Sequence, residues 1–301
     1  MKEVALQTKV DALARFVGPA SPEHERALRG LKALREGRLH DVESNISAIP
    51  DAPVVHLVWK LVLSADLALE RGLANEAEAC ALQALGGLSF DAMKLNVNSA
   101  LAATKTERLD DESEIVRLSG VVLIRLGQAY RRLERVKLAD CAHQAALRLF
   151  EKSGSLEDQW SACRNLALDA EVEQEYKNAI AWHEKAVQLA AQCAVDRDRL
   201  HAITLHGLAR CRLANGEFER AVADSRSAYE EWCHQDRGGW DAVRADRDLG
   251  EALLCWGKSL FDAEPTKAGD ILREAAERLK TAQREMAAFE SVVADLVTCE
   301  E

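Results

Sequence analysis

The chain has 301 residues, of which 48% are hydrophobic and 30% are charged, and its net charge is −11 at pH 7. Ala and Leu make up about 30% of it, whereas Gly and Pro together make up about 7%, against about 12% in average proteins. This composition excludes a disordered chain and leaves too few chain-breaking residues for a many-stranded sandwich or barrel. The negative charge argues against nucleic acid as a partner, because it repels phosphate backbones. We therefore expect an all-α globular protein.

Apolar runs and cysteine spacing bear on where the protein resides. The most apolar stretch, residues 54–69, is interrupted by His56, Lys60 and Asp66 and is too short to cross a bilayer. Residues 1–6 lack the uninterrupted apolar run of a signal peptide. The eight cysteines stand singly, without a Cys-x-x-Cys pair, as is typical of small buried side chains in a reducing compartment. We expect a cytoplasmic protein that does not interact with membranes.

The apolar periodicity, together with the positions of Gly and Pro, predicts helices along the whole chain. The expected elements are, in order, a leading helix at residues 2–17, a degenerate hairpin at 23–49, a hairpin that turns near Gly72, an additional helix at 90–104, three regular hairpins over about 107–234, and a fourth hairpin with an insertion at 262–266.

Pairs of alanines seven residues apart recur along these hairpins. Seven residues span two helical turns, so both alanines of a pair lie on one face of a helix, where their small side chains let another helix approach closely. Five such pairs, each after a helical stretch and a short polar turn, indicate a repeat. The pairs are Ala77/Ala84, Ala139/Ala146, Ala179/Ala186, Ala221/Ala228 and Ala268/Ala275.

The residues around these alanines resemble the tetratricopeptide repeat (TPR) superfamily. Leu126, Gly127, Tyr130, Ala139 and Ala146 match its signature of Leu-Gly and Tyr in a first helix and two alanines in a second. The first alanines at positions 139, 179 and 221 are 40 and 42 residues apart rather than about 34, as in longer-helix variants of the superfamily. The resemblance implies an all-α, right-handed superhelical solenoid of about six helical hairpins, whose first helices line a concave groove.

The sequence predicts a single domain over residues 1–301, because no polar linker is long enough to divide it. Within it, residues 1–54 would be an N-terminal helix and degenerate hairpin, 55–276 the repeats, and 277–301 a C-terminal amphipathic helix. From Leu272 the apolar residues follow a helix-seam pattern, which is explained either by a capping helix on the last hairpin or by pairing with a second copy. The residues for such self-association are Met286, Phe289, Val293 and Leu296.

Basic and polar residues recur at the positions that would face the groove. On a chain of net charge −11, this row is a candidate site for an acidic peptide or another carboxylate. The alternative is that these are ordinary solvated arginines, some of them paired with Glu171 and Glu251. The candidate groove residues are Gln128, Arg131, Arg132, Arg164, Asn165, Leu168, Arg210, Leu213, Arg244 and Arg247.

Motifs for catalysis and for metal or cofactor binding are missing. The sequence has no phosphate-binding loop, nucleophile elbow or His-Glu-x-x-His pair, and we expect no catalytic residues, metal or cofactor. His143 and His183 each follow a first alanine by four residues, which indicates a shared packing or surface role. The carboxylate clamp of chaperone-binding TPR domains is matched by Asn165 alone, which argues against a chaperone co-factor.

The sequence therefore predicts a non-catalytic scaffold or adaptor that binds a peptide or partner helix in its groove. Pairing of the C-terminal helix with a second copy would make it a homodimer. The alternative is a regulatory sensor, in which a bound peptide or small ligand controls a partner protein.

Overall fold

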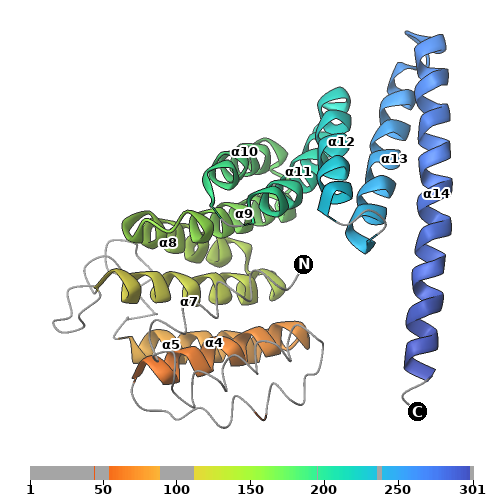
Figure 1. Ribbon diagram of the computed structural model, residues 1–301. Helices are drawn as coiled ribbons and strands as arrows, with labels where there is room; N and C mark the ends of the chain where they lie inside the picture. Colours follow the sequence, from red (N-terminus) through yellow and green to blue (C-terminus); the bar gives the residue numbers. More distant parts are fainter. Residues whose placement is uncertain (1–43, 45–53, 89–111, 195, 236–238, 299–301) are drawn as a thin grey trace. The chain divides into compact units, whose positions relative to one another are not determined.

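The structure, a computed structural model, describes residues 44, 54–88, 112–194, 196–235 and 239–298 (Figure 1). Two of the expected helices, at 2–17 and 90–104, lie outside these residues. So does the expected hairpin at 23–49, apart from residue 44. All regular structure in the described ranges is α-helical, which confirms the predicted fold class. The chain divides into two compact units, Met1–Asp169 and Ala170–Glu301, and each is described by itself. The single domain over 1–301 stays a prediction.

The described residues of the first unit form two helical hairpins and most of a further helix. These are α4 (Val54–Glu70) with α5 (Ala74–Gly87), α7 (Glu112–Arg132) with α8 (Val136–Ser153), and the greater part of α9 (Leu156–Val172). Ala65 and Leu69 of α4, Ala77 of α5 and Ala129 of α7 form one apolar cluster, so the two hairpins share a core. Between α7 and α8, the ring of Phe150 lies over Gly120, where a β-carbon would come within 2.4 Å of it.

The second unit contains the last residues of α9 and five further helices. These are α10 (Tyr176–Gln192), α11 (Arg197–Ala214), α12 (Phe218–Gln235), α13 (Trp240–Leu260) and α14 (Pro265–Thr298). Val222 of α12, Leu249 and Leu253 of α13 and Ala275 of α14 form one apolar cluster. The core of this unit therefore continues from helix to helix rather than gathering at one centre, as in other repeat folds.

The alanine pairs occupy the interfaces that their spacing predicts. All ten alanines are at most 2% exposed, and the pairs lie in the second helix of each hairpin, namely α5, α8, α10, α12 and α14. Because an alanine side chain extends so little, neighbouring helices can pack closely at these positions. The repeat deduced from the sequence is confirmed.

Four inter-helix turns share one backbone geometry. The residue five positions before the first alanine has positive φ in each case: Gly72 (76°), Glu134 (60°), Gln174 (60°) and Gly216 (80°). The residue three positions after the end of each hairpin's first helix donates its backbone N–H to a carbonyl five positions earlier, as from Arg135 to Tyr130 at 2.9 Å. This hydrogen bond gives a partner to a carbonyl that has none within the helix. It forms only when the residue just before the donor has the left-handed backbone conformation. Glu134 and Gln174 therefore adopt a conformation that favours glycine.

Glycine at position 134 is expected to raise the free energy of unfolding by about 0.5 to 1 kcal/mol, because it removes the steric cost of the left-handed conformation. Gly216→Ala is expected to lower it by about 1 kcal/mol, since no atom lies within 4 Å of the new methyl group and only backbone strain changes. Denaturant titrations of both variants measure these shifts. A loss of stability in Glu134→Gly would contradict the explanation.

Helix α14 differs from its predicted boundaries. It is continuous from Pro265 to Thr298, so there is no break between residues 276 and 277. The predicted insertion at 262–266 falls at the turn of the fourth hairpin: the turn between α13 and α14 is 261–264, and 265–266 already belong to α14. Proline suits the first helical position.

The first half of the α14 seam packs on α13, and the two helices run side by side (Figure 1). Leu272 lies against Gly257 and Leu279 against Gly250, while Ala282 is fully buried. This is the packing of the second helix of the last hairpin, and a separate capping helix over 277–301 stays a prediction. Met286 is half-buried, and the side chains of the other proposed self-association residues, Phe289, Val293 and Leu296, lie outside the described ones.

Candidate functional site

Three of the predicted groove residues in the first unit join a buried polar network. Gln128 Nε2 and Arg131 Nη2 donate to Asn165 Oδ1 over 3.3 and 3.1 Å, and Arg131 Nη1 donates to Asp169 Oδ1 over 2.8 Å. The other oxygen of Asp169 lies 2.5 Å from Nδ1 of His143. The His143 and Asp169 side chains are 0% and 2% exposed, so the network is a structural core of polar groups.

The other predicted groove residues of the first unit are less deeply placed. Arg132 is exposed and donates to the backbone oxygen of Leu69. The Arg164 guanidinium lies 6.0 Å from the centre of the Trp160 ring, within the range of a cation–π contact. Leu168 is half-buried. Arg132, Arg164 and Leu168 therefore each keep part of the side chain accessible to a partner.

The second unit has a pocket of about 170 Å³ formed by α11, α12 and α13. Three of the predicted groove residues, Arg210, Leu213 and Arg247, line it together with Asp248 and Glu251. The side chain of Arg210 is 54% exposed and that of Arg247 is 37% exposed. The fourth predicted residue of this unit, Arg244, lies outside the pocket and within 3.7 Å of Asp241.

Carboxylates neutralise the pocket's arginines. Arg247 Nη2 donates to Asp248 over 2.8 Å, and its Nε lies 3.6 Å from a Glu251 oxygen. Burial by itself would raise the pKa of Asp248, but His206 and Arg247 outweigh burial and hold that pKa below its ordinary value. Arg210 is paired with Glu171. The row of arginines is therefore ion-paired in part, as the alternative interpretation predicted, and a ligand would have to exchange with these carboxylates.

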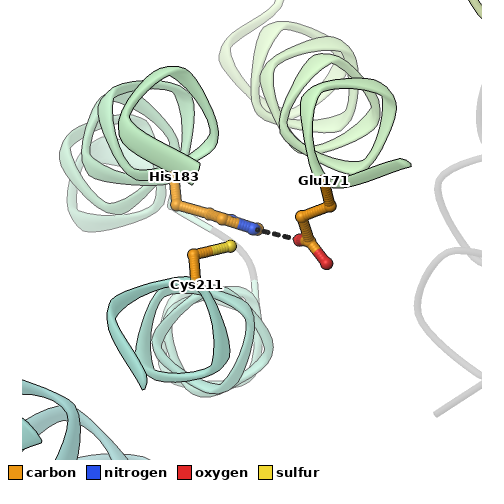
Figure 2. A group of neighbouring side chains, drawn as sticks. All are labelled: Glu171, His183 and Cys211. Atoms are coloured by element: carbon orange, nitrogen blue, oxygen red, sulfur yellow. Dashed lines mark hydrogen bonds and ion pairs between the residues drawn. The ribbon is translucent and has the colours of Figure 1, made fainter. Parts of the chain in front are cut away.

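A second group in this unit combines a carboxylate, an imidazole and a thiol. Figure 2 shows Glu171 from the end of α9 and His183 from α10 directed at one another, with the sulfur of Cys211 from α11 beside them. His183 Nε2 lies 3.1 Å from Glu171 Oε1, and one donor atom from each residue falls within 4.8 Å of the others. We call this group the Glu–His–Cys triad.

The backbone of α11 makes room for the triad. His183 lies between Ala179 and Ala186 on the packed face of α10, and its ring covers Gly207, where a β-carbon would be 2.4 Å from Cε1. Gly207 is one helical turn before Cys211, so both lie on the same face of α11. The triad side chains of His183 and Glu171 are 2% and 14% exposed.

The electrostatics of the triad favour an ionised carboxylate beside a protonated thiol. Burial alone would raise the pKa of Glu171, but His183 and Arg210 lower it to about 2. Burial raises the pKa of the Cys211 thiol well above its ordinary value, and the neighbouring Glu171 carboxylate raises it further. The negative charge at Glu171 is thus fixed, and the thiol keeps its proton unless a cation displaces it.

The triad was missed in the sequence, where no metal site was expected. Its members stand at positions 171, 183 and 211, without the close spacing of a metal-binding motif. Position 183 did carry a signal, because the repeat places it between two buried alanines. The sequence predicted either a packing role or a surface role for both His143 and His183. Because both side chains are buried, the structure favours the packing role.

Two further observations concern the chain's expected location and cysteines. None of the described helices has both the length and the apolar character needed to cross a membrane. Seven cysteines lie in described residues and are unbonded to one another; Cys163, Cys193 and Cys211 are buried, whereas Cys141 is exposed. Burial of single cysteines was therefore predicted correctly for some positions and not for all.

Comparisons with known proteins agree on the fold. No family model matches the chain, and no curated protein matches its sequence. Many solved structures are similar to it, among them the following three. The structure of BtubC (BKLC) from P. vanneervenii is 16% identical, with 90% of this chain and 93% of that chain covered and a TM-score of 0.58. A putative kinesin light chain with nearly identical TPR-like repeats from Podospora anserina is 16% identical, with coverages of 78% and 100% and a TM-score of 0.54.

The third is the apo form of the quorum sensor NprR from B. thuringiensis, which is 13% identical, with coverages of 90% and 68% and a TM-score of 0.57. At these identities the likeness concerns the fold. The resemblance found in the sequence is confirmed at that level: the chain has the TPR-like helical repeat fold.

Proposed function

We propose that this chain is a non-catalytic interaction module, a scaffold or adaptor that binds a peptide or partner helix carrying acidic side chains. The observation that carries the proposal is the pocket of α11–α13, where the half-exposed Arg210 and Arg247 stand beside the apolar side chain of Leu213. Apolar contacts supply affinity in such a groove, and arginines orient a bound carboxylate.

The internal ion pairs are compatible with ligand exchange. Glu251 follows Arg247 by four residues in α13, and exposed pairs of this kind contribute only about 0.3 to 0.5 kcal/mol. A guanidinium has five N–H donors. Within the described residues Arg210 donates through Nη2 alone, so its other donors are available to a peptide carboxylate. A ligand can therefore bind Arg210 through these donors and Arg247 in place of Glu251, while Asp248 keeps its contacts with Arg247 and His206.

Two immobilised peptide libraries test the proposal. One contains Asp and Glu at fixed positions, and the other replaces them with Asn and Gln. We expect the wild-type chain to prefer the acidic library about tenfold, since a hydrogen bond to a charged group contributes about 1.5 to 3 kcal/mol. Arg247→Glu is expected to abolish this preference. Arg220→Glu makes the same charge change at a side chain that is 73% exposed and outside the pocket, and it should behave as wild type.

Equal binding of both libraries by the wild type, or equal losses in Arg247→Glu and Arg220→Glu, would rule out recognition through the pocket. The predicted site also includes the first unit, so Arg164→Glu belongs in the same series. Recovery of cellular partners on the wild type and on these variants then shows whether the natural ligand uses the same residues.

A regulatory sensor is the second candidate. One of the similar structures is named a quorum sensor, and in this chain Arg210 both lines the pocket and pairs with Glu171 at the end of α9. A ligand that captured Arg210 would release that pair and change the contacts between α9 and α11. Hydrogen exchange distinguishes the two candidates: a sensor shows altered protection in these helices on binding, whereas a plain adaptor does not.

Self-association stays a prediction. The pairing of Leu279 with Gly250 and of Leu272 with Gly257 sets an antiparallel register in which Trp240, the first residue of α13, is level with residue 289. The last residues of α14 therefore extend past the helix on which it packs. Light scattering on a chain that ends at Ala282 is the measurement; an unchanged mass would exclude a homodimer through this segment.

A further inference from the structure

We propose that Glu171, His183 and Cys211 form a zinc-binding site, which goes beyond the proposed peptide binding and does not depend on it. The three residues present oxygen, nitrogen and sulfur donors from three helices, and these atoms lie within 4.8 Å of one another. They are also the group that Figure 2 shows converging on one point. Within the described residues, no other set of three such side chains meets this criterion.

The donor set matches the chemistry of zinc. Zn²⁺ is borderline-soft and accepts thiolate, imidazole and carboxylate in one tetrahedral site. With bonds of about 2.0 to 2.3 Å, tetrahedral ligand atoms lie about 3.5 Å apart. His183 Nε2 and Glu171 Oε1 are already 3.1 Å apart, so small rotations of the side chains are enough to reach this geometry. Three protein ligands leave the fourth position for water or another ligand.

The surroundings support coordination. The imidazole ring of His183 packs directly on the backbone of Gly207. Arg210 donates to Glu171 Oε2, which leaves Oε1 directed at His183. A hydrogen bond to the non-ligating oxygen is the usual way in which a second group orients a carboxylate ligand. In the metal-free chain the ionised Glu171 carboxylate accepts a hydrogen bond from Nε2–H of His183, while Nδ1 is buried without a partner among the described residues. Coordination through Nε2 therefore moves the ring proton to Nδ1. Glu171 is half-buried, which leaves a path from solvent.

Binding balances in charge and protons. The Glu171 carboxylate enters ionised. The neutral imidazole transfers its proton from Nε2, where Glu171 accepts it, to Nδ1, and the Cys211 thiol releases one proton to solvent as the zinc–sulfur bond forms. The ion's two positive charges then meet one carboxylate and one thiolate, so the site is neutral. No oxidation or reduction takes place.

The preceding repeat offers an internal comparison. His143 holds the equivalent position, four residues after Ala139, and it also contacts a carboxylate, at Asp169. That carboxylate is bound by Arg131, and no cysteine joins the pair within the described residues. The two sites therefore differ in the third donor, and zinc binding should be specific to the triad.

The experiment uses the full chain after treatment with a chelator, and Co²⁺ is the probe because its thiolate complexes absorb in the near ultraviolet. We expect one equivalent of Co²⁺ to produce the sulfur-to-cobalt charge-transfer band and visible bands of tetrahedral intensity, and Zn²⁺ to abolish them. In Cys211→Ser the charge-transfer band should be lost. In His183→Ala and Glu171→Gln the affinity should fall at least about 10- to 100-fold, the loss already typical when a group that only orients a metal ligand is removed. Cys193→Ser, a buried cysteine outside the triad, should retain both band and affinity.

Circular dichroism of each variant shows whether it is folded, and only folded variants are compared for loss of the band. Glu171→Gln is chosen because glutamine has nearly the same shape as glutamate and should not disturb folding. Absence of the charge-transfer band in the folded wild type overturns the proposal. So does a band that persists in Cys211→Ser and disappears in Cys141→Ser, since the exposed Cys141 would then be the cobalt ligand.

Discussion

Asp169→Ala is expected to lower the free energy of unfolding by about 3 kcal/mol, the largest effect of any single substitution considered for this chain. The Asp169 side chain is 2% exposed and bonds to both Arg131 and His143. Its removal leaves a guanidinium and an imidazole in a buried position without their carboxylate. The cost then arises mainly from the unpaired groups that remain rather than from the bonds that are lost.

Chemical denaturation measures this effect, and Asp140→Ala is the matched control. Asp140 contacts Gln144 on its own helix over 2.8 Å, and its loss should cost less than about 0.5 kcal/mol. The double variant Asp169→Ala/Arg131→Leu should lose less than the two single variants added together, because one of the orphaned charges is gone. Equal effects of Asp169→Ala and Asp140→Ala would show that the network contributes little.

Gly127→Ala is expected to cost about 2 kcal/mol, within the range for inserting a methyl group into a packed core. A β-carbon at position 127 would lie 2.3 Å from Nε2 of His143, and that ring cannot retreat easily because Asp169 holds it. The signature glycine of the repeat is thus needed for the approach of a side chain from the paired helix.

A second helical glycine provides the control for this prediction. Gly269 in α14 has no atom within 4 Å of its would-be β-carbon. Gly269→Ala should therefore stabilise the chain by about 0.5 to 1 kcal/mol, since alanine favours the helix. If packing decides the outcome at position 127, the unfolding midpoint Tm falls in Gly127→Ala and rises in Gly269→Ala. Shifts of the same sign would mean that it does not.

Much of the fold could be predicted because it depends on short-range patterns. The alanine pairs identify one face of each second helix, and all ten alanines are buried there. The left-handed turns are only partly visible in the sequence. Gly72 and Gly216 mark two of them, but Glu134 and Gln174 adopt the same conformation without a glycine to signal it. The hydrogen bonds of the surrounding hairpin impose the geometry there.

The candidate groove shows the limit of the same reasoning. Periodicity placed Arg131, Arg210 and Arg247 on the inner face of their helices, and two of them do line a pocket. It could not show that Arg131 is held by Asp169, because that contact joins residues 38 positions apart on different helices. The pairing of a charge depends on the side chain opposite it, and a one-dimensional period does not contain that information.

The sequence by itself determined the helical class, the repeat and the small residues at its interfaces, because these follow from composition and from the 3.6-residue period of a helix. Only the tertiary structure decided which polar groups meet. The meeting of Glu171, His183 and Cys211 depends on how far α9, α10 and α11 are offset along one another, and packing of the side chains between the helices sets that offset.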